Sequence, residues 1–153
     1  MITPSSFRES IQKAVAHLGI DLANCEVGGL VFVDDEAVRV RITSCGLQTV
    51  SVTGLALPFP DGGVFVFHTH PSECWPSELD LQSAMRSPFP ILIVGQDGAV
   101  VIKKEQLLII RLVPNDGALF DADNLVVEGV DAEPFDDHWC RRGGASHPES
   151  SGE

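Results

Sequence analysis

Two histidines separated by one residue are the part of this sequence best suited to chemistry. His68 and His70 lie in the segment His68-Thr69-His70-Pro71, and Asp80 follows. Imidazole nitrogens and carboxylate oxygens are typical zinc ligands, at about 2.0–2.1 Å from the ion. Three protein ligands leave a fourth position open, which distinguishes a catalytic zinc site from a structural one. The segment therefore predicts a Zn2+ site formed by His68, His70 and Asp80.

The residues before the histidines indicate how the two rings are positioned. Residues 63–67 are apolar and β-prone, which predicts a strand running into His68. Alternate side chains of a strand share a face, so His68 and His70 should point the same way. Pro71 lacks an N–H and should end the ladder. Cys74 lies in the loop that follows. We expect it to be a bystander, because the ligand set is complete without its thiolate.

Asp80 lies at a predicted helix start. Ser77 and Asp80 have the spacing of a capping box, with Ser77 at the N-cap and Asp80 at the N3 position. Taken alone, this pair is most simply a helix cap. The nearby histidines favour a ligand role for Asp80. The two roles are compatible, because the first turn of a helix holds a ligand rigidly.

Together, these motifs resemble the signature of a known enzyme family. The His-x-His-Pro segment followed by the Ser-x-x-Asp box is similar to the motif of the JAMM (JAB/MPN) metalloproteases. That family also uses a glutamate far upstream, beside a Gly-Leu-rich strand, and Glu26-Val27-Gly28-Gly29-Leu30 matches this pattern. The resemblance covers residues 7–113. The loop over residues 72–76 is shorter than is usual in the family, and the family's long insertions have no room here.

The resemblance implies a role for each residue. His68, His70 and Asp80 would bind zinc, Glu26 would act as general base, and Ser77 would donate a hydrogen bond to the developing oxyanion. The implied reaction is hydrolysis of an amide or isopeptide bond, most often after the C-terminal glycine of a ubiquitin-like protein. The simpler alternatives are that Glu26 is a surface residue before a strand and that Ser77 only caps a helix.

Other functions remain open for a compact prokaryotic or phage protein of this kind. They are a phage tail-assembly peptidase, a peptidase that processes a sulfur-carrier protein, and a non-catalytic scaffold of the same fold. The presence of all five site residues argues against the scaffold.

Charge and composition narrow the partners and the location. The net charge of −12 weighs against nucleic acid and anionic membranes as partners. No apolar run reaches the roughly 18–20 residues of a membrane span, and the first residues lack the features of a signal peptide. The cytoplasm is therefore expected. Without a secretion signal, the four cysteines are expected to be free thiols; they are Cys25, Cys45, Cys74 and Cys140.

The expected elements alternate between helices and strands. Ser6 and Glu9 have capping-box spacing before a helix that Gly19 ends. Later elements are a helix after Ser77 and strands over residues 26–33, 38–43, 49–57, 91–94, 99–102 and 107–113.

This order predicts an α+β fold. The resemblance extends it to a single JAMM-like domain with a mixed, mostly antiparallel, curved sheet flanked by helices. Residues 1–113 would form this peptidase core. Residues 114–132 would extend it or add a short strand at 125–127, and residues 133–153 have the composition of a disordered acidic tail.

Overall fold

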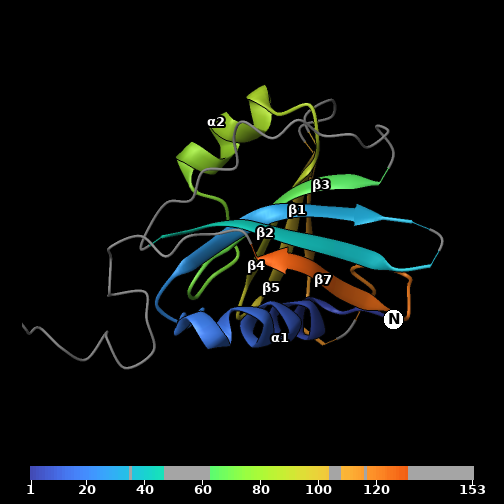
Figure 1. Cartoon of the computed structure of the whole chain (residues 1–153). Coiled ribbons are helices and arrows are strands. Elements are labelled where there is room, and N and C mark those ends of the chain that lie inside the picture. The colour runs from blue at the N-terminus through green and yellow to red at the C-terminus, as the bar shows by residue number, and fades with distance from the viewer. Residues whose placement is uncertain (35, 47–62, 104–107, 116, 131–153) are drawn as a thin grey trace, which may run out of the picture.

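The protein forms one mixed β-sheet with a helix on each face (Figure 1). The computed structural model describes residues 1–34, 36–46, 63–103, 108–115 and 117–130. Within these ranges the elements are α1 (Pro4–Val15), a 3-10 turn (Ala16–Leu18), β1 (Glu26–Val33), β2 (Val38–Gly46), β3 (Val64–Thr69), α2 (Glu78–Arg86), β4 (Ile91–Gly95), β5 (Gly98–Lys103), β6 (Leu108–Leu112) and β7 (Leu125–Val130).

The described strands lie in the order β6-β5-β4-β3-β1-β2-β7. The β3–β4 and β2–β7 pairs are parallel, and the other four pairs are antiparallel. This confirms the predicted α+β class with a mixed, mostly antiparallel sheet. The short strand expected at residues 125–127 is part of β7. The strand expected over 49–57 and the tail over 133–153 lie outside the described residues.

Helix α1 begins earlier than its predicted start at Ser6. Thr3 is the N-cap: its hydroxyl accepts from the Ser6 N–H at 3.1 Å, and the Thr3 N–H donates to the Ser6 hydroxyl at 2.9 Å. Ser6 therefore occupies the N3 position of the capping box. Pro4 fits the first turn because that position needs no N–H donor. After the 3-10 turn, Gly19 ends the helical segment with a φ of 76°.

The face of the sheet covered by α1 holds the main hydrophobic core. Phe7, Ile11 and Val15 of α1 are fully buried there. The rings of Phe7 and Phe67 meet edge to face, with centroids 5.5 Å apart. Phe120 belongs to the same cluster. Residues beyond the predicted peptidase domain over 1–113 therefore also contribute to this hydrophobic cluster.

The opposite face, covered by α2, holds a smaller apolar cluster. Cys74 and Ala84 pack there against side chains of β4 and β5. Ala84 is the buried residue of α2, whereas Leu79 and Met85 are exposed. Helix α2 therefore contributes little apolar burial, and the remainder of this face is available for polar chemistry.

The cysteines correct one expectation. Cys45 and Cys74 are buried thiols, but Cys25 is disulfide-bonded. A composition argument about free thiols could not identify that bond, because pairing depends on which cysteines the fold brings together. No helix in the described ranges is long and apolar enough to cross a membrane.

Candidate metal centre

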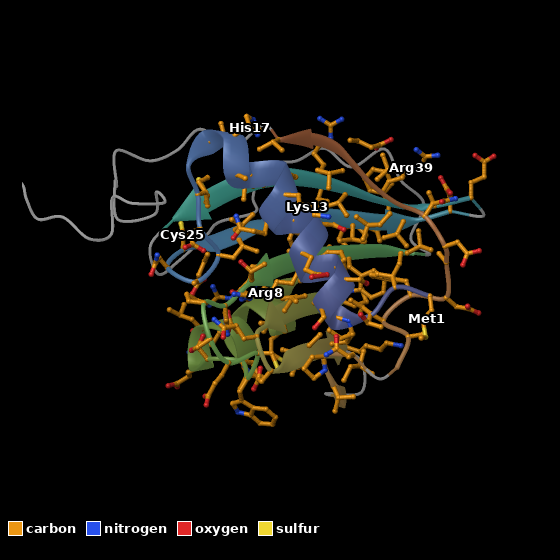
Figure 2. All side chains as sticks on the ribbon, turned by 90° about the horizontal axis from the view of Figure 1, so that it is seen from below. Met1, Arg8, Lys13, His17, Cys25 and Arg39 are labelled. Atoms are coloured by element: carbon orange, nitrogen blue, oxygen red, sulfur yellow. The ribbon has the colours of Figure 1, made fainter. Side chains whose placement is uncertain are left out.

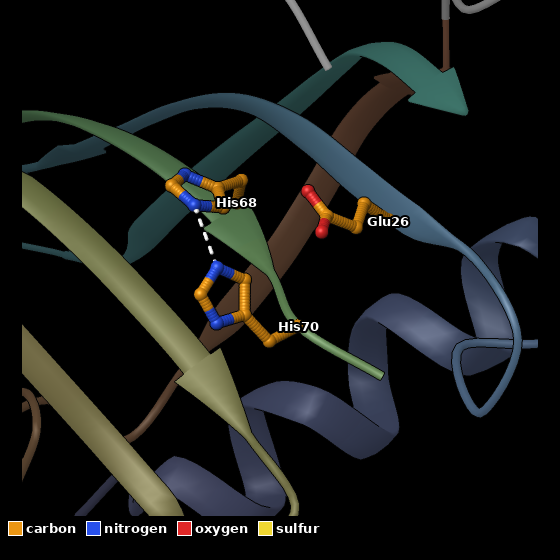
Figure 3. Close-up of side chains that lie close together, drawn as sticks. All are labelled: Glu26, His68 and His70. Atoms are coloured by element: carbon orange, nitrogen blue, oxygen red, sulfur yellow. Dashed lines mark hydrogen bonds between the residues drawn. The ribbon is translucent and has the colours of Figure 1, made fainter. Parts of the chain in front are cut away.

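The two histidines converge at the end of β3, on the face of the sheet that carries α2. Their Nε2 atoms lie 3.2 Å apart (Figure 3). His70 lies one residue beyond β3, yet its N–H still donates to the Val94 carbonyl at 2.9 Å. The pairing thus extends past Thr69, and the alternation predicted for the two rings is maintained. Their side chains are only 12% and 13% exposed, so the nitrogens are shielded but reachable.

Asp80 reaches the same point from the first turn of α2. Its Oδ1 lies 3.0 Å from Nε2 of His68, and its Oδ2 lies 3.1 Å from Nε2 of His70. Ligands at about 2.0–2.1 Å from a tetrahedral zinc are about 3.3–3.4 Å apart. The three side chains are therefore spaced as one ion requires. The structure brings together the three side chains that the sequence predicted as metal ligands.

A hydrogen bond determines which nitrogen of His70 carries a proton. Nδ1 of His70 lies 2.9 Å from the Glu73 carbonyl, which can only accept, so Nδ1 donates. Neutral His70 then presents a lone pair at Nε2, facing the Asp80 carboxylate. Two such groups in contact require a cation or a proton between them. A backbone carbonyl behind a ring also orients metal-binding histidines in general.

The pKa shifts of His70 and Asp80 agree with this arrangement. Burial alone would lower the pKa of His70, but its hydrogen bond to Asp80 and the charge of that carboxylate leave the pKa raised. Burial would raise the pKa of Asp80, but its hydrogen bonds to His68 and His70 hold the pKa well below its usual range. Asp80 therefore remains a carboxylate, the form that binds a metal.

This donor set fits zinc. Two imidazole nitrogens and one carboxylate oxygen make a three-ligand set of the kind found in catalytic zinc sites. A mixed nitrogen and oxygen set also admits iron, cobalt or manganese, so the set alone does not fix the metal.

Glu26 faces the histidines from β1, the neighbouring strand (Figure 3). Gly28 pairs with His68 across the ladder, which places Glu26, two residues earlier, on the same face of the sheet. Because Gly28 has no side chain, nothing from it separates the carboxylate from the rings. Burial raises the pKa of Glu26, although the nearby imidazoles oppose the rise.

Two carboxylates thus compete for the third ligand position. Ligand atoms of Glu26, His68 and His70 all lie within 4.8 Å of one another, so this trio could also hold a metal ion. The Asp80 oxygens are closer, at 3.0 and 3.1 Å from the ring nitrogens. Asp80 is thus the carboxylate nearer to the ring nitrogens, and Glu26 lies beside it.

Ser77 is the N-cap of α2, as predicted. Its hydroxyl accepts from the Asp80 N–H at 3.1 Å, and its own N–H donates to Asp80 Oδ2 at 2.8 Å. The box therefore also fixes the carboxylate that faces the histidines. Ser77 is exposed, and its hydroxyl proton is not used in the box.

The turn between β4 and β5 holds the loop that joins His70 to α2. The Gln96 N–H donates to the Ser72 carbonyl at 2.7 Å, and its side-chain amide donates to the Pro71 carbonyl at 2.9 Å. Asp97 Oδ1 accepts from the Cys74 N–H at 2.8 Å. At Gly95, an added Cβ would lie 2.5 Å from the Cys74 nitrogen, so a larger residue would displace the loop.

These supporting residues were not predicted from the sequence. Neither was Thr69, whose buried hydroxyl accepts from the Val27 N–H at 3.0 Å and so secures the start of β1 beside Glu26. A hydroxyl between two histidines was a usable signal, since it must lie on the opposite face of the strand. No local pattern indicated that Gln96 and Asp97 hold the loop after His70.

Comparison with known proteins does not identify a family for this chain. No protein-family model matches the chain, and no curated protein matches it.

Proposed function

We propose that this protein is a zinc-dependent peptidase or isopeptidase of the JAMM type that hydrolyses an amide bond. One observation carries the proposal: nitrogens of His68 and His70 lie 3.0–3.1 Å from the Asp80 carboxylate, and Glu26 faces the same point (Figure 3). A metal-ligand set beside a partly buried carboxylate is the minimum that metal-assisted hydrolysis needs.

The bound metal and Glu26 have separate roles in this proposed reaction. Zinc, when bound, supplies Lewis-acid activation of the water and of the scissile carbonyl. Glu26 takes a proton from the attacking water as the new C–O bond forms. It returns that proton to the leaving amine as the C–N bond breaks. Its raised pKa suits both steps, because a base works best with a pKa near the operating pH.

Ser77 completes the arrangement as a hydrogen-bond donor to the oxyanion. Its hydroxyl oxygen is held by the Asp80 N–H, so the donor is oriented before substrate binds. Such preorganised donors stabilise charge that develops in the transition state.

The proposed substrate is a ubiquitin-like protein cleaved after its C-terminal glycine. The family resemblance suggests this class, and the rim of the site agrees with a polypeptide substrate. Trp75 and Leu79, two residues on either side of Ser77, are 57% and 63% exposed. Large apolar side chains exposed beside a site are typical of surfaces that bind proteins.

The test is cleavage of ubiquitin-like proteins extended beyond a C-terminal Gly-Gly by a reporter peptide. We expect cleavage after the second glycine by protein carrying about one zinc per chain, and none after chelation. The protein is purified without added metal and analysed for its elements. The matched control is Asp80→Asn, which keeps the shape but weakens the third ligand.

Two outcomes would contradict the proposal. One is a chain that binds no transition metal even after reconstitution. The other is a zinc-loaded chain that cleaves none of the fusions, which would favour the scaffold alternative.

A further inference from the structure

Arg8 of α1 lies behind the candidate metal centre and is partly buried. Its Nη1 donates to the His70 carbonyl at 2.8 Å and to the Val94 carbonyl at 3.4 Å. Its Nη2 donates to the Leu22 and Pro71 carbonyls at 3.2 and 3.1 Å. Among the described residues, the side chain of Arg8 thus donates hydrogen bonds to four backbone oxygens.

These carbonyls come from three separate segments, each of which contains or adjoins residues of the candidate metal centre or its supporting loop. His70 and Pro71 end the histidine strand. Leu22 lies in the loop that leads into Glu26. Val94 lies in β4, just before the turn that holds the following loop. Figure 2 shows Arg8 on the same side of α1 as Cys25, the residue that precedes Glu26.

The chemistry of the side chain explains why an arginine is placed here. A guanidinium carries five N–H donors in a rigid fork, whereas an ammonium is a point charge on a flexible stem. Burial lowers the pKa of Arg8, with the charge of Asp21 opposing. A neutral side chain would avoid this desolvation cost, but none carries enough N–H donors to bond four carbonyls at once.

We propose that Arg8 is a positioning residue for the metal centre. By joining the ends of β3 and β4 to the loop before β1, it fixes the backbone of His70 relative to that of Glu26. This inference rests on the proposed metal site. Arg8 contacts neither metal nor substrate, so its removal should loosen the ligand set rather than remove a ligand.

The test compares Arg8→Gln and Arg8→Lys with Gln12→Met. Gln12 lies one turn further along α1 and holds the same loop, through the Ile20 carbonyl at 2.9 Å and the Leu22 N–H at 2.8 Å. Within the described part of the chain its side chain has no hydrogen bond to the histidine segment, so it reports what general loosening of the loop does. Zinc and cobalt(II) affinities are measured by chelator competition, together with the cobalt visible spectrum and thermal unfolding.

We expect Arg8→Gln to lower metal affinity by roughly 10–100-fold, as loss of outer-shell support does elsewhere. Arg8→Lys should recover only part of this. Gln12→Met should keep wild-type affinity and spectrum. Folded Arg8 variants that match the wild type overturn the inference, as does an equal loss in Gln12→Met.

A second measurement needs no variant. In the wild type, zinc should shift the NMR signals of the Arg8 guanidinium but not those of Arg39, which pairs with Asp34 and Glu128. Absence of an Arg8 shift contradicts the inference even if the Arg8 variants do not fold. A wild type that binds no metal overturns this inference and the proposed function together. A wild type that binds metal, together with folded Arg8 variants that bind it equally well, overturns the inference alone.

Discussion

The two faces of the sheet are built in different ways. On the α1 face, side chains such as Phe7, Ile11 and Phe67 are fully buried in one large cluster. On the α2 face, the apolar cluster is small and Ala84 is the buried residue of the covering helix. That second face carries the histidines, Asp80 and Glu26, and α2 is tied to them by polar bonds.

The difference separates stability from chemistry. Burial on the α1 face supplies most of the apolar contribution to folding, which is proportional to the area removed from water. The α2 face holds carboxylates and imidazoles, whose desolvation is costly unless they are paired. Substitutions of apolar side chains on the α1 face and of polar side chains on the α2 face should therefore affect different measurements, and this expectation can be tested.

The largest effect is expected for Glu26→Gln on the α2 face. The amide keeps the shape of the side chain but cannot take the proton of the attacking water, so the cleavage rate should fall roughly 10²–10⁴-fold. Zinc content and melting temperature should stay near those of the wild type. Near-normal turnover of the zinc-loaded variant would show that another group is the base.

Phe7→Ala should have the opposite profile. Removing a fully buried phenylalanine from the α1 face should cost about 3–5 kcal/mol of unfolding free energy, measured by denaturant titration. Metal affinity of the folded fraction should not change. Leu79→Ala is the matched control, because truncating an exposed side chain should cost under about 0.5 kcal/mol. Loss of metal binding in folded Phe7→Ala would show that the two faces are not independent.

The helix caps allow a finer comparison, since Thr3 and Ser77 have the same role on opposite faces. Each alanine substitution should cost about 1 kcal/mol of stability. Only Ser77→Ala should also lower kcat, and by more than it changes KM, because an oxyanion donor acts in the transition state. If Ser77→Ala lowers the melting temperature and leaves kcat unchanged, Ser77 is only a cap.

The smallest effect concerns pH. In the metal-free protein the pKa of His70 is raised, so its pairing stabilises the fold fully below about pH 6.5 and is lost as pH rises through the folded pKa. The pKa of Asp80 is lowered, so its contribution is present above about pH 3.9 and is lost as pH falls.

Metal affinity should change in the other direction. A proton and a metal ion compete for the same nitrogen of His70, so affinity should rise with pH by up to about tenfold per unit for each proton released. Melting temperature of the metal-free chain and metal affinity, measured from pH 5.5 to 8, should therefore have opposite slopes. His17→Gln, on the 3-10 turn, is the control and should leave both slopes in place.

The sequence predicted those features whose cause is local. Strand β1 begins at Glu26 as expected, and Ser77 caps α2 because its partner lies three residues along the chain. The α1 start was misplaced because Thr3 with Ser6 and Ser6 with Glu9 both have capping-box spacing. Only the fold decides between two such boxes.

The support of the site could not be predicted, because it depends on contacts between distant segments. Arg8 donates to a carbonyl 62 residues away, and Cys74 donates to Asp97, 23 residues away. Neither contact leaves a periodic pattern in the sequence. The parallel pairing of β2 with β7 is of the same kind.

The weak apolar attachment of α2 has a consequence for how the molecule opens. A helix attached to the sheet by one carboxylate and one buried alanine can detach without disturbing the main core, as a local unfolding event. A cation that binds only the closed form at 100 times its Kd would add about 2.7 kcal/mol to the free energy of that opening. Loss of the metal would then first increase the rate of proteolysis around α2, while the sheet and α1 remain folded.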